Sequence, residues 1–167
     1  MQAPAPLTVR PLRERPVDLF FVVAFATFCC TSIFFDSLNA FGIPITPDAD
    51  NAIARMTYEL YAKDTDLLLA ANPWMVQLEL WISTFVFAPF YVAAIYALVK
   101  GRDWIHIPAI AFAAAMVYSL VLYLGHQFVP PYVSPNPVKV FAANGPYALI
   151  AVAFAYRMRK PRPFSET

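Results

Sequence analysis

Charged residues are scarce in this sequence. Of its 167 residues, 14% are Asp, Glu, Lys or Arg, whereas 60% are hydrophobic. Soluble globular domains carry about 25% charged residues, so this composition excludes an ordinary soluble domain and predicts an integral membrane protein. The formal net charge is +1, and no basic stripe with interleaved aromatic residues is present. A nucleic-acid-binding surface is therefore not expected.

Cysteine and the motifs of soluble enzymes are also nearly absent. The sequence has 2 cysteines, Cys29 and Cys30, which are adjacent within an apolar run. We interpret them as small hydrophobic side chains rather than as a disulfide or a metal site. No Gly-rich phosphate loop, CxxC pair or HExxH motif is present. The sequence therefore predicts no metal and no cofactor.

What the sequence does contain is long apolar runs. The hydrocarbon core of a bilayer is about 30 Å thick, and about 20 helical residues cross it. Four segments meet this requirement: Val17–Asp36, Trp74–Val99, Trp104–Leu124 and Val138–Tyr156, the last interrupted by Gly145-Pro146. A signal peptide is the alternative for the first, but no small-x-small cleavage pattern follows it. The predicted fold class is an all-α membrane protein, a bundle of four transmembrane helices.

The predicted domain organisation has three parts. Residues 1–16 are a Pro- and Arg-rich, flexible N-terminal tail, residues 17–159 are the transmembrane domain, and residues 160–167 are a basic C-terminal tail. If the N-terminus is cytoplasmic, nine of the 12 Lys and Arg residues lie on the cytoplasmic side. Since cytoplasmic segments carry the excess of basic residues, we expect both termini in the cytoplasm.

One long polar connection, residues 37–73, separates the first two runs. Thr46-Pro47 is typical of a helix start, and Ile53, Met56 and Leu60 then recur at helical spacing. This pattern predicts a short amphipathic helix over the membrane surface. Two acids follow it, Asp64 and Asp66. Either of them is a candidate to return a carboxylate to the bundle.

Glu79 is the only charged residue between Trp74 and Lys100. An acid in hydrocarbon costs about 2.5–3.5 kcal/mol, so it is a functional-site hypothesis by default. Without a cation it favours its neutral form, and we expect it to donate a hydrogen bond to Asp36 or Asp66. Pro89, ten residues later, is expected to bend the helix and open space beside it.

The predicted topology brings several polar residues to the same half of the membrane. They are Asp36, Glu79, Tyr123, His126 and Asn144. Such an arrangement predicts a cavity in the outer half, closed on the cytoplasmic side and lined by Phe, Tyr and Trp. It would suit a mostly apolar ligand with one cationic or hydroxyl group. Purely structural interpretations stay open: an interfacial cap for Asp36, an interfacial His126 and a helix-bridging Asn144.

Several short motifs occur in a characteristic order. They are Phe34-Phe35-Asp36, Tyr61-Ala62-Lys63 followed by acids, Pro89-Phe90, Tyr96-Ala97-Leu98-Val99-Lys100-Gly101, Trp104-Ile105, Pro108-Ala109-Ile110 and Pro146-Tyr147-Ala148-Leu149-Ile150. In this order the chain resembles the EXPERA-type four-helix membrane proteins. Within them it resembles the sigma-2 receptor branch most, and more distantly the sterol isomerase branch of emopamil-binding proteins.

The resemblance implies particular site residues. Asp36 and the acid after Tyr-Ala-Lys would be the ligand-site carboxylates, and we take the second to be Asp66 rather than Asp64. Glu79 is comparable to the glutamate in the second span of these relatives. Asn144 with Tyr147 is similar to the isomerases, in which an aromatic residue follows an asparagine by three positions.

These observations favour two alternative functions. In the first, the protein binds sterols and lipophilic cationic molecules through Asp36, Asp66 and Glu79, with Tyr123, His126, Asn144 and Tyr147 nearby. In the second, the protein is a sterol or terpenoid isomerase or cyclase whose catalytic acids and bases are Glu79, Asp36 and Asp66. A structural partner of other membrane proteins is a third interpretation.

The expected partners and location follow from the same interpretation. The partners are a lipophilic small molecule and membrane lipid, and assembly as a homodimer is left open. The resemblance implies the endoplasmic reticulum for a eukaryotic source. For a bacterial source we expect the inner membrane.

Overall fold

A computed structural model describes residues 10–164 of the protein, and within this range every regular element is helical. Four helices are long and apolar enough to cross a membrane: Pro16–Ala40, Trp74–Lys100, Asp103–His126 and Pro137–Arg157. The predicted fold class, an all-α membrane protein with four transmembrane helices, is confirmed.

Two of the spans are built from several helical segments. The first comprises α1 (Pro16–Thr31), the π-helical turn η2 (Ser32–Asp36) and α2 (Ser37–Ala40). The second comprises α6 (Trp74–Ile82), the π-helical turn η4 (Ser83–Phe87) and α7 (Ala88–Lys100). The third is a short 3₁₀ turn, η5 (Asp103–Ile105), followed by α8 (His106–His126), and the fourth is α9 (Pro137–Arg157).

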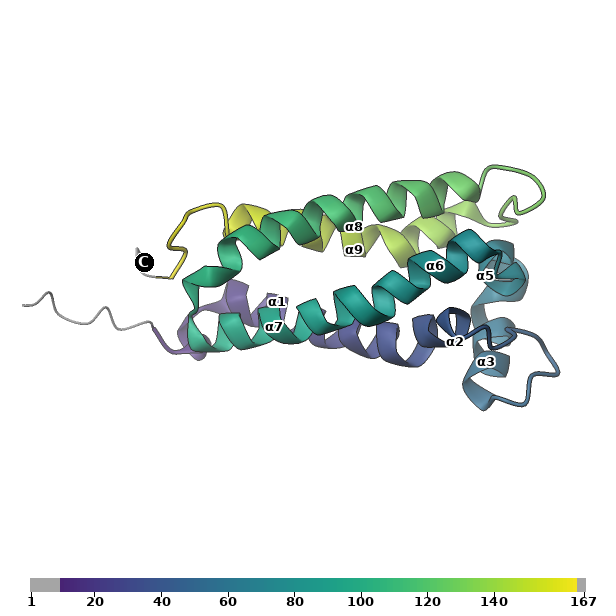
Figure 1. The fold of residues 1–167 in the computed structure, drawn as a ribbon, viewed down its shortest axis with the longest axis horizontal. Coiled ribbons are helices and arrows are strands. Elements are labelled where there is room, and N and C mark those ends of the chain that lie inside the picture. The colour runs from purple at the N-terminus through teal and green to yellow at the C-terminus, as the bar shows by residue number, and fades with distance from the viewer. Residues whose placement is uncertain (1–9, 165–167) are drawn as a thin grey trace, which may run out of the picture.

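The spans form two pairs, because α1 packs most extensively against α7 and α8 against α9 (Figure 1). One end of the bundle holds the 3₁₀ turn η1 (Leu12–Glu14), the 101–105 turn and residues 158–164, and we call it the termini end. The opposite end carries residues 41–73, which we call the cap. Its helical segments are α3 (Ala52–Thr57), η3 (Tyr58–Ala62), α4 (Lys63–Thr65) and α5 (Leu67–Ala71).

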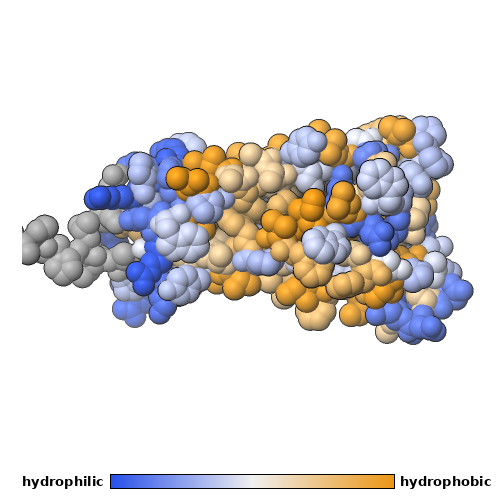
Figure 2. Space-filling view, viewed as in Figure 1, coloured by the Kyte–Doolittle hydropathy of each residue, from blue (hydrophilic) through white to orange (hydrophobic). Residues whose placement is uncertain are grey.

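The outer surface between the two ends is apolar. Figure 2 shows a broad hydrophobic zone between hydrophilic ends. Large side chains such as Phe34, Val92 and Leu149 are exposed on it. A soluble monomer rarely exposes apolar patches of this extent, whereas lipid contact accounts for them.

Aromatic side chains fill the termini half of the bundle. Phe25 is fully buried and stacks on Tyr91 with ring centroids 5.6 Å apart. The rings of Phe90 and Phe112 stack at 4.2 Å and extend the same cluster. These rings belong to the main hydrophobic core of the protein, which packs the interior of this half of the bundle closely.

A buried ion cluster holds the termini end together. Asp18 is 1% exposed and accepts hydrogen bonds from Arg15 at 2.8 Å and from Arg157 at 3.0 and 3.1 Å. Both guanidinium groups also face the buried ring of Phe164, at 5.3 and 5.4 Å from its centroid. Sequence reasoning missed this cluster, because Asp18 lies near the start of an apolar run and its partner Arg157 is far along the chain.

Several local expectations are corrected. The cap helix begins at Ala52 with Asn51 as its N-cap, because the Asn51 side chain accepts hydrogen bonds from two backbone N–H groups; Thr46-Pro47 lies in the preceding turn. Pro146 does not interrupt the fourth span, which stays helical through it. Pro89 itself lies in the first turn of α7, and the second span departs from regular α-helix just before it, in the π-helical turn η4.

The predicted tails are described only in part. The N-terminal tail lies mostly outside the described residues, and α1 begins at Pro16. In the C-terminal segment, residues 165–167 lie outside them, whereas Phe164 is packed against the bundle.

Candidate functional site

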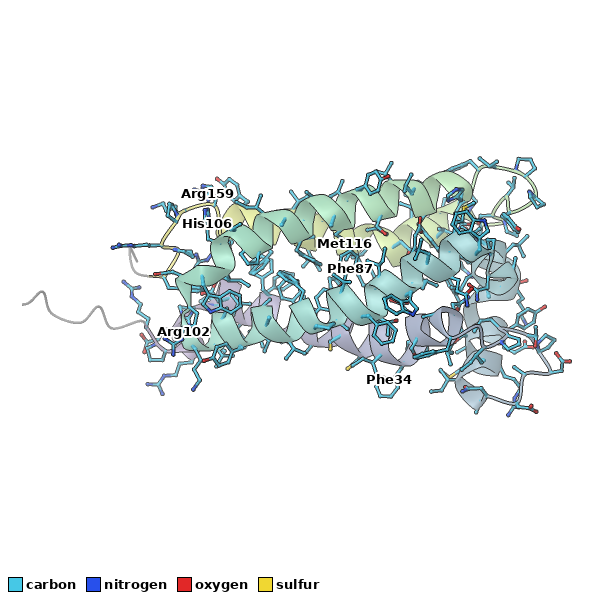
Figure 3. All side chains as sticks on the ribbon, in the orientation of Figure 1. Phe34, Phe87, Arg102, His106, Met116 and Arg159 are labelled. Carbon is cyan, nitrogen blue, oxygen red and sulfur yellow. The ribbon has the colours of Figure 1, made fainter. Side chains whose placement is uncertain are left out.

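An internal cavity lies between the four spans and the cap. Its volume is about 400 Å³, and side chains from every span and from the cap line it. This volume falls within the range of about 300–1,000 Å³ that is usual for small-molecule pockets. Figure 3 shows Phe87 and Met116, two of the lining residues, facing the space between the two helix pairs.

Asp36 enters the cavity from the π-helical turn that ends the first span. Ser83, on the facing π-helical turn η4, donates a hydrogen bond to Asp36 Oδ2 at 2.7 Å. The hydroxyl of Ser32 lies 2.9 Å from that of Ser83, which completes a chain from Ser32 through Ser83 to the carboxylate. The two distorted turns therefore meet at Asp36 and hold its carboxylate at the wall of the cavity.

Asp66 is fully buried between the cap and α8. Tyr123 donates to Oδ2 at 2.7 Å, whereas Gln127 and the backbone N–H of Leu69 donate to Oδ1 at 2.7 and 3.0 Å. Tyr61 adds a longer bond to Oδ2 at 3.3 Å. Four donors satisfy a buried carboxylate well. Asp66 therefore holds the cap to the third span while it lines the cavity.

Asn144 reaches the same network from the fourth span. Its amide donates to the Tyr61 hydroxyl at 3.3 Å and to the Val140 carbonyl at 2.9 Å. Burial and the adjacent Asp66 carboxylate raise the pKa of the Tyr61 hydroxyl above its usual range. Tyr61 therefore remains protonated and able to donate. Two successive hydrogen bonds therefore connect Asn144 through the Tyr61 hydroxyl to Asp66.

Glu79 also lines the cavity, but unlike Asp36 and Asp66 it has no hydrogen-bond donor that holds it among the described residues. Its Oε2 atom is buried and has no hydrogen-bond partner. The predicted hydrogen bond to Asp36 or Asp66 is therefore wrong. Ser83 and Tyr123 supply hydrogen bonds to those two carboxylates instead.

Tyr147 is positioned by the first span. Its hydroxyl lies 2.8 Å from the Thr31 hydroxyl, which in turn donates to the Phe28 carbonyl, and its ring stacks on Phe28 at 4.1 Å. Tyr147 and Asn144 both line the cavity. The pair singled out in the sequence therefore faces the space that a ligand would fill.

Some predicted site residues lie elsewhere. His126 does not line the cavity, and its buried Nδ1 has no partner. It is the last residue of α8, three positions beyond the cavity-lining Tyr123 and so about 4.5 Å further along the helix axis. Asp64 is exposed on the cap, so of the two neighbouring acids it is Asp66 that faces inward.

The aromatic part of the lining is supplied by Phe and Tyr alone. Trp74, Trp81 and Trp104 are 73%, 47% and 50% exposed, and none of them lines the cavity. The expectation that tryptophan contributes to the wall is wrong. These side chains lie on the outer surface, where their amphipathic rings suit the membrane interface.

Several cavity residues were missed in the sequence, and Tyr91 is the most unusual of them. Tyr91 is 0% exposed, lines the cavity and has a buried hydroxyl with no partner. A tyrosine within an apolar helix is equally typical of a lipid-facing position. Only its packing against Phe25 and Phe112 shows that Tyr91 faces the interior and not the lipid.

The lining carries acidic groups and no basic side chain. Asp36, Asp66 and Glu79 all border the cavity, and no Lys, Arg or His is among the described residues that do. Apart from these acids the wall is mostly aliphatic and aromatic. The site is therefore electrostatically complementary to a cation carried on an apolar body.

The cavity is bordered by residues that also face outward. Phe35 from η2 and Met56 and Leu60 from the cap line it, although they are 37%, 44% and 76% exposed. Their exposure places the edge of the cavity at the apolar outer surface, beneath the cap.

The fold and the site together define a four-span membrane protein with an acidic, largely apolar internal cavity. A comparison with protein-family models matches residues 52–158, more than half of the chain, to EBP, described as EXPERA (EXPanded EBP superfamily). The chain belongs to this superfamily. No curated protein and no solved structure matches it.

Proposed function

We propose that the protein binds sterols and lipophilic cationic small molecules in the internal cavity, in the manner of sigma-2-type receptors. The observation that carries the proposal is the charge of the lining: three carboxyl groups and no basic side chain among the described lining residues. A cation would find a partner there, whereas an anion would be repelled.

The three acids have different roles in this proposal. Asp36 contacts the ligand cation, because its carboxylate lines the cavity and is held by a hydroxyl group rather than by a basic side chain. Asp66 positions the cap, because four donors already engage both of its oxygens. Glu79 is the second ligand contact, since its Oε2 is buried and has no partner.

The lipophilic part of the ligand is supported by the wall and by the edge of the cavity. Phe35, Leu80 and Met116 are among the apolar side chains that would surround it. Burial of apolar surface contributes about 25 cal/mol per Å², so such a wall favours a large hydrocarbon body. Access from the bilayer suits a molecule that partitions into lipid.

A matched pair of ligands tests the proposal. The first is a lipophilic tertiary amine, and the second is its neutral analogue with an ether oxygen in place of the nitrogen. With the protein in lipid nanodiscs, we expect the amine to bind at least about tenfold more tightly, a difference of roughly 1.4 kcal/mol. Equal affinities, or a preference for the ether, would contradict the proposal.

A second function, isomerisation of a sterol or terpenoid double bond, is supported by a different observation. Glu79 Oε2 and the Tyr91 hydroxyl are buried, lack partners and line the same cavity. In such a reaction an acid delivers a proton to one carbon of the double bond, and a base removes a proton from a neighbouring carbon. The reaction is balanced and needs no co-reactant.

Solvent exchange tests the second function. The protein is incubated with a Δ8-sterol in D₂O, and the sterol is analysed by mass spectrometry. A shifted double bond with one incorporated deuterium is expected of an isomerase. Unchanged sterol would exclude this activity on Δ8-sterols and leave binding as the function.

A further inference from the structure

The Tyr91 side chain presents an unused hydrogen-bonding group at the floor of the cavity. Tyr91 is 0% exposed, it lines the cavity, and its hydroxyl has no partner among the described residues. On the second span it is the cavity residue nearest the termini end, since Glu79, Ser83 and Phe87 precede it. Along this span the hydroxyl is thus separated from Glu79, whereas Asp36 on the first span is close enough to interact with it electrostatically.

The tyrosine ring is fixed by its neighbours. It stacks on Phe25 at 5.6 Å and meets Phe28 and Phe112 edge-on at 5.8 and 5.6 Å. A ring packed on several sides cannot turn its hydroxyl toward another protein group. The cavity is therefore the only direction in which the hydroxyl finds a partner.

A hydroxyl at this position is unfavourable in the empty protein. The surrounding rings belong to phenylalanines, and a buried hydroxyl without a partner destabilises the folded state relative to phenylalanine at the same position. A buried polar group without a partner calls for an explanation, such as a bound water molecule or a functional role. The feature is explained if an atom of the ligand reaches the floor.

We propose that Tyr91 is a specificity-determining residue that hydrogen-bonds to an oxygen atom at the far end of the ligand. The inference rests on the proposed binding function and narrows the ligand class. The ligand carries two polar groups, a cation or hydroxyl that meets Asp36 and Glu79 and an oxygen that meets Tyr91. A hydrocarbon body joins them.

The spacing of these residues sets the shape of the ligand. Glu79 and Tyr91 are twelve positions apart on one span, which corresponds to about 18 Å along a helix axis at about 1.5 Å per residue. The tyrosine side chain leans back toward the start of its helix, which shortens the distance between the functional groups. An elongated, rigid body such as a steroid nucleus matches this arrangement better than a compact one.

The test combines one variant with one pair of ligands. Tyr91→Phe removes only the hydroxyl. Tyr96→Phe is the matched control, because Tyr96 lies on the same helix, is 49% exposed and does not line the cavity. The ligands are a 3-aminosteroid with a 17-ketone and the same aminosteroid without the 17-oxygen.

Wild-type protein and Tyr96→Phe are expected to bind the ketone about five- to tenfold more tightly than the deoxy steroid. Tyr91→Phe is expected to lose this preference and to bind the deoxy steroid as tightly as wild type. Without ligand, the melting temperature of Tyr91→Phe is expected to equal or exceed that of wild type, because an unpaired hydroxyl is gone.

Other outcomes overturn the inference in distinguishable ways. If wild type binds both steroids equally, or if Tyr91→Phe still prefers the ketone, Tyr91 does not hydrogen-bond to a ligand oxygen. The proposed binding function is unaffected by either result. A lower melting temperature of ligand-free Tyr91→Phe than of Tyr96→Phe would make the hydroxyl structural. If neither steroid binds wild type, the proposed function itself fails for this ligand class, and the inference fails with it.

Discussion

Ser83 donates a hydrogen bond to Asp36 Oδ2 at 2.7 Å, and each residue belongs to a π-helical turn, on the second and first span respectively. Single π-helical turns inside longer helices are rare and occur frequently at functional sites. Here two of them face each other at the cavity. The distortion of both helices is thus concentrated where a ligand-binding carboxylate is held.

The first prediction concerns Asp36. Asp36→Asn keeps the shape of the side chain and removes its charge, so a cationic lipophilic ligand should lose a charge-assisted contact worth roughly 1.5–3 kcal/mol, or about 10- to 150-fold in affinity. Equilibrium binding of a lipophilic amine measures the change. Asp64→Asn is the control, because Asp64 is exposed on the cap and does not line the cavity. Unchanged affinity in Asp36→Asn would remove Asp36 from the ligand contacts.

A substitution of Glu79 distinguishes a binding protein from an enzyme. Glu79→Gln keeps the volume and a hydrogen-bond donor but cannot transfer a proton. If the protein only binds, affinity for the lipophilic amine should fall by less than about tenfold, or roughly 1.4 kcal/mol. If Glu79 is a catalytic acid, deuterium incorporation into a Δ8-sterol should stop while the sterol still binds. Full turnover by Glu79→Gln would exclude that role.

The attachment of the cap depends on Asp66. Tyr123→Phe removes one hydrogen bond to its buried carboxylate, which should lower the free energy of unfolding by about 1.5–3 kcal/mol. Tyr118→Phe, on the same helix but 68% exposed, should change it little. Thermal unfolding in a mild detergent compares the two variants. Equal melting temperatures would mean that this bond does not hold the cap.

The ion cluster at the termini end is expected to be important for stability. Asp18→Asn leaves the guanidinium groups of Arg15 and Arg157 without their shared carboxylate, and breaking a buried ion pair in this way costs about 3–5 kcal/mol. A marked decrease in melting temperature is therefore expected. Glu14→Gln, which alters an exposed acid nearby, should leave it unchanged. Should both variants melt like wild type, the cluster contributes nothing measurable.

Membrane orientation can be tested with single cysteines, in a protein whose Cys29 and Cys30 are replaced by alanine. We propose that the termini end is cytoplasmic, as the distribution of basic residues indicates. Cysteine at Arg102 should then be labelled only from the cytoplasmic side, and cysteine at Asp48 only from the other side. These positions avoid Gly101, whose φ of 62° is unfavourable for other residues, and the helix cap Asn51. The opposite labelling pattern would reverse the topology.

Much of the fold could be predicted because each span is a local property of the sequence. A run of about 20 apolar residues must satisfy its backbone hydrogen bonds internally within a bilayer, and a helix does this alone. The same reasoning identified Glu79 as exceptional, since an acid within an apolar run can be recognised without knowledge of its partners. The order of the short motifs indicated the superfamily that residues 52–158 then matched.

Contacts between distant segments were decided only by the tertiary structure. Asp66 rather than Asp64 faces the cavity because Tyr123 and Gln127, far along the chain, supply its donors. His126 does not line the cavity although Tyr123, three residues earlier on α8, does, because the extent of the cavity depends on how the segments pack.

Two further features had no signal in the sequence, Asp18 between Arg15 and Arg157 and the unpaired hydroxyl of Tyr91. Composition and apolar periodicity follow from the energetics of each segment in water or lipid, so the sequence by itself determined the four transmembrane spans. Hydrogen-bond partners and the direction of individual side chains depend on packing between segments. Only the tertiary structure could therefore decide which polar residues share the cavity.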